Sequence, residues 1–128
     1  MDRKTSTTDC PPPDAEPANS RVFRCAKSNP PVAREMKTHE ETGRLPMADP
    51  CLRQALSVFT NLKDAQHQVR LFPGWRRRFV LLADLEPVHG KVKPTKGQQP
   101  SHTSWWPAQG LDAEQRAALF RLSCEVRL

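Results

Sequence analysis

The side chains that could do chemistry gather in one stretch of basic residues and tryptophans. Residues 70–103 hold seven Lys or Arg against two Asp or Glu, and two adjacent tryptophans follow. Cations for phosphates, interleaved with flat rings for bases, are what binding of single-stranded nucleic acid requires. The predicted contact residues are Arg76, Arg77, Arg78, Lys91, Lys93, Lys96, Trp105 and Trp106.

The basic run and the tryptophans also have simpler structural interpretations. A basic run is often only a solvated face, and tryptophans in a small protein more often fill the core than stack on bases. We therefore expect Trp105 and Trp106 to fold back over the core rather than form a binding edge. The sequence carries no signature of a common nucleic-acid-binding motif, and a net charge of +6 suits an acidic protein surface equally well.

His102 is the candidate residue for catalysis. Hydroxyl groups stand beside it in Ser101 and Ser104, and a serine or cysteine next to a histidine base is the usual arrangement of an activated nucleophile. No nucleophile elbow, phosphate-binding loop or HExxH motif frames it, and five glycines offer little material for a pocket. The sequence predicts a protein that is not an enzyme, with an enzyme using His102 as the weakest alternative.

Metal ligands are not spaced for binding, because the four histidines are dispersed and no two cysteines lie two residues apart. We expect no metal or other cofactor. The N-terminus lacks the apolar core of an export signal, and no stretch is long enough to cross a membrane. A cytoplasmic location and reduced cysteines are therefore expected, with a disulfide framework as the minor alternative. The cysteines are Cys10, Cys25, Cys51 and Cys124.

Composition divides the chain into two segments. Hydrophobic residues make up 37%, and residues 1–46 hold seven of the 13 prolines but one aromatic residue, Phe23. Such a segment has too little apolar surface to offset the entropy of ordering. We expect a disordered tail over 1–46 and a small folded module over 47–128.

A first helix is predicted over residues 50–68. Asp49 stands at the N-cap, and Pro50 takes the first helical position, where its missing N–H does no harm. Apolar residues then follow at helical spacing, which indicates an amphipathic helix lying on a core. They are Leu52, Ala55, Leu56, Phe59, Leu62, Ala65 and Val69.

A second helix is predicted over residues 112–124. Asp112 can cap its N-terminus, and Gln115 can return a bond to Asp112 as in a capping box. Ala118, Leu119, Leu122 and Val126 supply a short apolar face that would dock on the first helix.

Between these helices, Phe79–Leu85 forms an apolar run that suits a buried strand or an inward-turned helix. A second strand around Lys91–Lys93 favours a hairpin, and residues 94–109 have the composition of a loop. The predicted fold class is α+β: a two-helix module with a central β-hairpin and a basic loop, behind a disordered tail. An all-α arrangement is the alternative.

The function predicted from these features is that of a small, basic, non-catalytic interaction protein. Its basic loop would meet nucleic acid, or else an acidic protein surface. The main alternative is a structural or orphan protein with no specific ligand.

Overall fold

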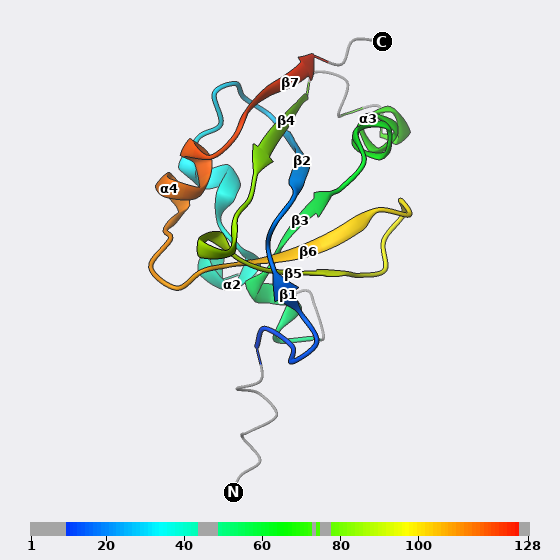
Figure 1. Cartoon of the computed structure of the whole chain (residues 1–128). Helices are drawn as coiled ribbons and strands as arrows, with labels where there is room; N and C mark the ends of the chain where they lie inside the picture. Colours follow the sequence, from blue (N-terminus) through cyan, green and yellow to red (C-terminus); the bar gives the residue numbers. More distant parts are fainter. Residues whose placement is uncertain (1–9, 44–48, 73, 75–77, 126–128) are drawn as a thin grey trace, which may run out of the picture.

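A single β-sheet is the framework of the molecule. The computed structural model describes residues 10–43, 49–72, 74 and 78–125. Seven strands within these residues form an antiparallel sheet in the order β1-β5-β6-β3-β2-β4-β7 (Figure 1). The strands are β1 (Glu16–Pro17), β2 (Arg21–Ala26), β3 (Leu56–Phe59), β4 (Phe79–Asp84), β5 (Gly90–Pro94), β6 (His102–Pro107) and β7 (Arg121–Glu125).

Three short α-helices and three 3-10 turns connect these strands in the described part of the chain. Figure 1 shows α3 on one side of the sheet and α4 on the other. The α-helices are α2 (His39–Thr42), α3 (Leu62–Leu71) and α4 (Ala113–Ala118), and the 3-10 turns are η1 (Ala33–Met36), η2 (Leu52–Gln54) and η4 (Pro87–His89).

The sheet consists of two halves that meet at the strands β2 and β3. One half is β1-β5-β6-β3, and the other is β2-β4-β7. Phe23 of β2 pairs with Phe59 of β3, and this is the one registered pair between the two strands. In contrast, β2 and β4 pair over the whole of β2, from Arg21 opposite Asp84 to Ala26 opposite Phe79. Since β2 and β3 share so little pairing, side chains can enter the space between them.

Apolar residues are buried on both faces of the sheet. In β4, Leu81 and Ala83 belong to the core beneath α4, while Val80 and Leu82 belong to the core beneath α3. A strand covered on both faces has no polar side and gives a continuous apolar sequence. This double burial explains why the run in β4 does not alternate.

The predicted fold class is wrong, because the chain is a seven-stranded antiparallel sheet rather than a two-helix module around a hairpin. The β4 segment is a strand, yet it pairs with β2 and β7, whereas β5 pairs with β1 and β6. No hairpin therefore joins β4 to β5. The all-α alternative is wrong as well, and the segment expected to be a loop over 94–109 contains β6.

The helix predicted over 50–68 is wrong in its first part, while residues 62–68 lie in the helix α3. Asp49 does accept a bond from the backbone N–H of Cys51, at 2.8 Å, but the turn that follows ends at Gln54. The chain then extends as β3 and pairs residue by residue with β6. The true N-cap is Asn61, which starts α3. Inter-strand pairing overrides a helical spacing that residues of β3 also satisfy.

The predicted fold class included a disordered tail over residues 1–46, and this part is wrong because Arg21–Ala26 form the strand β2. This strand pairs with both β3 and β4, so it lies inside the sheet. Val22 and Phe23 are buried in the cores on opposite faces of the sheet. The low aromatic content misled the prediction, because this segment adds its few apolar residues to a core built by the rest of the chain. Residues 1–9 lie outside the described part.

The second predicted helix is half right. Asp112 and Gln115 form the expected capping box, with both bonds at 2.9 Å. The helix ends at Ala118 rather than 124, because the next residues pair with β4 as β7. Phe120 packs near Trp105, with the ring centroids 6.0 Å apart.

A disulfide joins Cys10 to Cys51, with their Cα atoms 5.4 Å apart. The expectation that these two cysteines are reduced is therefore wrong, because the fold brings together residues separated by 41 positions. Cysteine pairing is unusual for the cytoplasm, and the cytoplasmic location stays a prediction. Among the described helices, none is long and apolar enough to cross a membrane.

Reducing this disulfide should destabilise the fold. A cross-link between residues 41 positions apart restricts the unfolded chain and contributes about 4 kcal/mol in the chain-entropy description. Urea unfolding with and without a phosphine reductant should show this loss, and Cys51→Ser should reproduce it. A midpoint that the reductant leaves unchanged would contradict the presence of the cross-link.

Candidate anion-binding site

Arg24 of β2 lies where the two halves of the sheet separate. Its Nη1 donates to the carbonyl oxygen of Ser57 in β3 at 2.7 Å, and its Nη2 donates to the carbonyl oxygen of Glu35 in η1 at 2.8 Å. Its Nε is buried and has no partner among the described residues. One guanidinium therefore bridges three elements, and its Nε–H is unused.

The charge of Arg24 is near the Glu35 carboxylate, which favours the charged form, but the two side chains form no ion pair in the described structure. Burial lowers the pKa of its guanidinium, but arginine stays protonated in proteins. The nearby Glu35 carboxylate instead accepts bonds from the Lys27 backbone and the Ser28 hydroxyl. Within the described chain, Arg24 makes no ion pair. A half-buried cation that makes no ion pair attracts an external anion.

Arg24 lines three adjoining cavities of about 460, 230 and 470 Å³. The first is lined by basic and hydroxyl side chains over a small apolar wall, and no Asp or Glu is among its described lining residues. Its lining is Arg24, Lys37, Thr38, His39, Leu52, Ala55, Leu56, Ser57, Thr95, Lys96, His102 and Ser104. Such a cavity carries a positive potential and attracts anions.

His102 sits in this cavity at the start of β6. Its Nε2 lies 3.1 Å from the Ser57 hydroxyl oxygen, and its Nδ1 lies 3.2 Å from the Thr95 carbonyl oxygen and 3.1 Å from the Thr95 hydroxyl oxygen. The Thr95 hydroxyl also lies 2.8 Å from that of Ser104. These contacts fix the imidazole between β3 and the segment that follows β5.

Two further neighbours hold the His102 ring. Phe59 packs edge-on against it, with the centroids 5.8 Å apart and the planes at 73°. Gly97 approaches so closely that a Cβ there would lie 2.5 Å from Cγ of His102. Only glycine leaves space for the ring at that position.

Helix α3 anchors the loop that carries Thr95, Lys96 and Gly97. The Asp64 carboxylate accepts a bond from the backbone N–H of Ser101 at 2.9 Å. Gln99 is buried and bonds both Gln68, at 3.3 Å, and His67, at 3.2 Å. The segment that closes the cavity is thus tied to the helix packed on the sheet.

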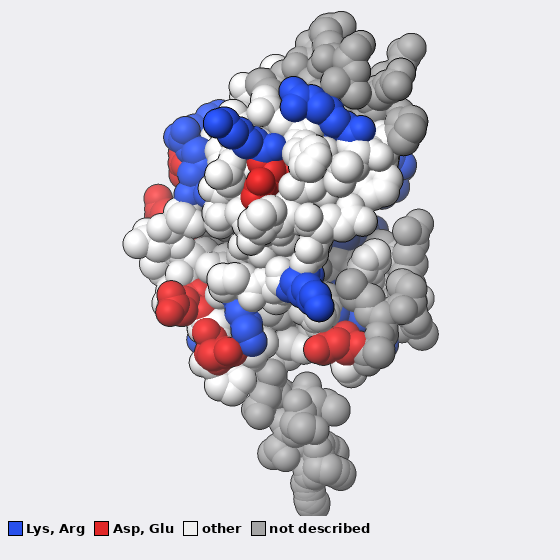
Figure 2. Space-filling view, turned by 90° about the vertical axis from the view of Figure 1, so that its right-hand side faces the viewer, with Lys and Arg blue, Asp and Glu red and all other residues white. Residues whose placement is uncertain are grey.

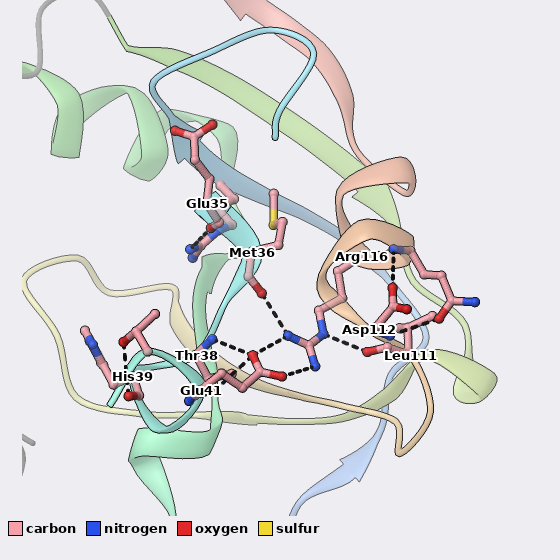
Figure 3. Close-up of polar contacts among 11 residues, drawn as sticks. Glu35, Met36, Thr38, His39, Glu41, Leu111, Asp112 and Arg116 are labelled. Atoms are coloured by element: carbon pink, nitrogen blue, oxygen red, sulfur yellow. Dashed lines mark hydrogen bonds and ion pairs between the residues drawn. The ribbon is translucent and has the colours of Figure 1, made fainter. Parts of the chain in front are cut away.

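The opposite wall is fixed by an ion pair between Arg116 of α4 and Glu41 of α2 (Figure 3). The two carboxylate oxygens of Glu41 accept from Nη1 and Nη2 of Arg116 at 2.7 and 2.9 Å. Arg116 also donates to the carbonyl oxygens of Met36 and Leu111. The same Glu41 carboxylate accepts from the Thr38 N–H at 2.8 Å. This network holds the backbone of residues 36–41, whose Lys37, Thr38 and His39 line the cavity.

The structure disperses the cationic residues predicted to bind nucleic acid. Lys96 lines the 460 Å³ cavity, and half-buried Arg78 lines the 470 Å³ cavity. Lys93 pairs with Asp14 at 3.0 Å, and Lys91 lines a separate, largely apolar cavity. Figure 2 shows one face, on which Lys and Arg are interspersed with Asp and Glu. The remaining two, Arg76 and Arg77, lie outside the described residues.

Both predicted stacking tryptophans are buried. Trp105 is 0% exposed and Trp106 is 4% exposed. The indole N–H of Trp105 donates to the carbonyl oxygen of His89 at 3.0 Å, and that of Trp106 donates to the carbonyl oxygen of Cys51 at 3.0 Å. The expectation that these rings cover the core is confirmed, and neither ring offers a face to a base.

The hydroxyl partner of His102 differs from the predicted ones. The sequence placed Ser101, Ser104 or a cysteine beside His102, but the residue that contacts its Nε2 is Ser57. In the described part, no group of three or more His, Cys, Asp or Glu residues could hold a metal ion.

Sequence reasoning missed Arg24, Lys37, His39, Ser57 and Thr95 as site residues. The one available signal was a charged residue, Arg24, flanked by the apolar residues of β2. No family model, curated protein or solved structure matches this chain. The geometry and charge of the cavity therefore supply the functional argument.

Replacing Glu41 with Gln should lower the free energy of unfolding by about 2 kcal/mol, because it leaves the charge of Arg116 without its partner. The side chain of Glu41 is 40% exposed, so the loss stays below that of a fully buried pair. Glu40→Gln is the matched control. It breaks the more exposed contact with Arg53 and should cost less than about 1 kcal/mol. Equal losses in urea unfolding would contradict the structural role of Glu41.

The same ion pair predicts a pH dependence. Arg116 and the capping bonds from Thr38 lower the pKa of Glu41 from 4.5 to about 2. A lowered pKa stabilises the fold above pH 4.5, and this contribution is lost as the pH falls from there through 2. Between pH 6 and 2, wild type should therefore lose more stability than Glu41→Gln. Parallel curves would show that Glu41 is not responsible.

Gly97→Ala should displace the His102 ring, because its Cβ would overlap the Cβ and Cγ atoms of that residue. We expect a loss of about 2 kcal/mol in urea unfolding and shifted His102 ring signals in NMR spectra. Gly74→Ala is the control, since a Cβ there meets nothing within 4 Å. Unchanged His102 signals in Gly97→Ala would contradict this close approach.

Proposed function

We propose that this protein binds a small anion of the phosphate-ester class in the cavity lined by Arg24, Lys96 and His102. The main support for the proposal is the half-buried guanidinium of Arg24, whose Nε has no hydrogen-bond partner and which makes no ion pair within the described chain. An anion in the adjoining cavity would balance that charge. Lys37 and Lys96 add exposed cations to the lining.

A phosphate group fits the donors better than a single carboxylate. Phosphate presents several acceptor oxygens, and guanidinium groups bind such oxygens with strong, charge-assisted bonds. The hydroxyl groups of Thr95 and Ser104 also line the cavity. Its volume of about 460 Å³ lies within the range of small-molecule sites.

The shape of the site favours a small ligand over a nucleic-acid strand. A strand needs a basic track with accessible rings. Trp105 and Trp106 are buried, and Lys93 is paired with Asp14. Two of the predicted cations, Lys96 and Arg78, line cavities that Arg24 also lines. Cavities of this size suit a compact anion.

Binding of inorganic pyrophosphate, measured by calorimetry, tests this proposal. Wild type should bind it, and Arg24→Gln should weaken the affinity about tenfold or more, which corresponds to the loss of one charged hydrogen bond. Because Arg24 also bridges backbone carbonyls, Lys96→Gln serves as a second variant at an exposed position and should weaken binding less.

Arg21→Gln is the matched control, because Arg21 is on the same strand but pairs with Asp84 outside the cavity. It should bind pyrophosphate as wild type does. Affinity should also fall as salt rises, since the attraction is electrostatic. Absence of binding to wild type, or equal losses in Arg21→Gln and Arg24→Gln, would refute the proposal.

A further inference from the structure

We infer that Ser57 and His102 form a nucleophile and general-base pair that cleaves a phosphodiester held in this cavity. The inference rests on the proposed anion site and assigns it a substrate class and a reaction. It revises the prediction that the protein is not an enzyme, and it gives His102 a partner that the sequence did not indicate.

The contacts of His102 are compatible with the tautomer that a general base needs. The Thr95 carbonyl oxygen, 3.2 Å from Nδ1, can only accept a hydrogen bond, and the neutral ring with its proton on Nδ1 satisfies this contact. Nε2 is then an acceptor, and the Ser57 hydroxyl, 3.1 Å away, is its donor. A serine that donates to a histidine, itself oriented by a third group, has the arrangement of an activated nucleophile.

The position of Ser57 gives a substrate access to the nucleophile. Ser57 and Phe59 lie two residues apart on β3 and share a face, but Phe59 is buried beneath α3 whereas Ser57 is exposed at the cavity. Ser57 therefore lies beyond the part of the sheet that the helix covers. His102 lies in β6 opposite Phe59, and its Nε2 contacts the Ser57 hydroxyl.

The surrounding charges match a phosphoryl transfer. Arg24 donates to the carbonyl oxygen of Ser57 itself, so its guanidinium lies next to the nucleophilic residue. Lys96 lines the same cavity. Such cations stabilise the negative oxygens of a phosphorus centre as its bonds change.

The reaction would proceed in two balanced steps. The Ser57 oxygen forms a bond to phosphorus while the bond from phosphorus to the leaving oxygen breaks. His102 Nε2 takes the Ser57 proton and passes it to the leaving alkoxide, which departs as an alcohol. In the second step His102 Nε2 takes a proton from water, and the water oxygen forms a bond to phosphorus while the bond from phosphorus to the Ser57 oxygen breaks. His102 then passes the proton to the Ser57 oxygen. The products are a phosphate monoester and free Ser57, with no oxidant or reductant required.

The test uses bis(p-nitrophenyl) phosphate with the full-length protein. Wild type should release p-nitrophenolate and carry a phosphate ester adduct on Ser57, detected by peptide mass spectrometry. Ser57→Ala should form no adduct at this position, and His102→Gln should slow release about a hundredfold or more. Ser20→Ala is the control, because this exposed serine lies outside the cavity, and it should react as wild type does.

Pyrophosphate binding to the same variants separates this inference from the proposed function. Ser57→Ala should still bind pyrophosphate, since Arg24 and Lys96 are intact. If wild type binds pyrophosphate but forms no adduct, or if His102→Gln reacts at the wild-type rate, the catalytic inference fails and the binding proposal stands. If wild type neither binds nor reacts, both fail.

Discussion

The ion pair between Arg116 and Glu41 is the interaction on which the arrangement of the site depends. It joins side chains 75 positions apart, and Arg116 is 7% exposed. A guanidinium at that depth needs several acceptors, and it has the Glu41 carboxylate together with two backbone carbonyls. Because the same carboxylate bonds Thr38 at the start of α2, the helix start and the ion pair form one network.

This network complements the weak join between the two halves of the sheet. β2 and β3 share one registered pair, so the sheet alone does little to fix their separation near Ser57. Arg24 spans this space through backbone carbonyls, while Arg116 and Glu41 secure η1 and α2 beside it. The cavity is thus a consequence of incomplete strand pairing, stabilised by two arginines that come from different parts of the chain.

Local signals in the sequence were sufficient for some features and misleading for others. The capping box at Asp112 and the burial of the two tryptophans follow from nearby residues, and both were predicted correctly. Leu52, Ala55, Leu56 and Phe59 have helical spacing, yet the strand β3 forms because β6 offers it four registered partners. Pairing between distant segments is invisible to periodicity, and this is why the sheet was missed.

The site was harder to predict than the fold. Lys96 was predicted as part of the basic stretch and His102 because serine hydroxyl groups stand beside it, but Arg24 lay in a stretch expected to be disordered. Ser57 lay within the segment predicted to be a helix, where it would have no relation to His102. Their proximity results from the register of β3 with β6, in which Phe59 lies opposite His102. No spacing within a single segment encodes that distance.

The short strand β1 has a consequence for how copies of this chain meet. A free sheet edge is a template for adding strands, and aggregation often starts there. Among the residues that the structure describes, Glu16 and Pro17 alone pair with the outer edge of β5, and Pro94 ends β5. Proline has no backbone N–H to donate, so a strand of another molecule can form few hydrogen bonds with this edge of the sheet. Strand addition between molecules is thereby disfavoured along this border.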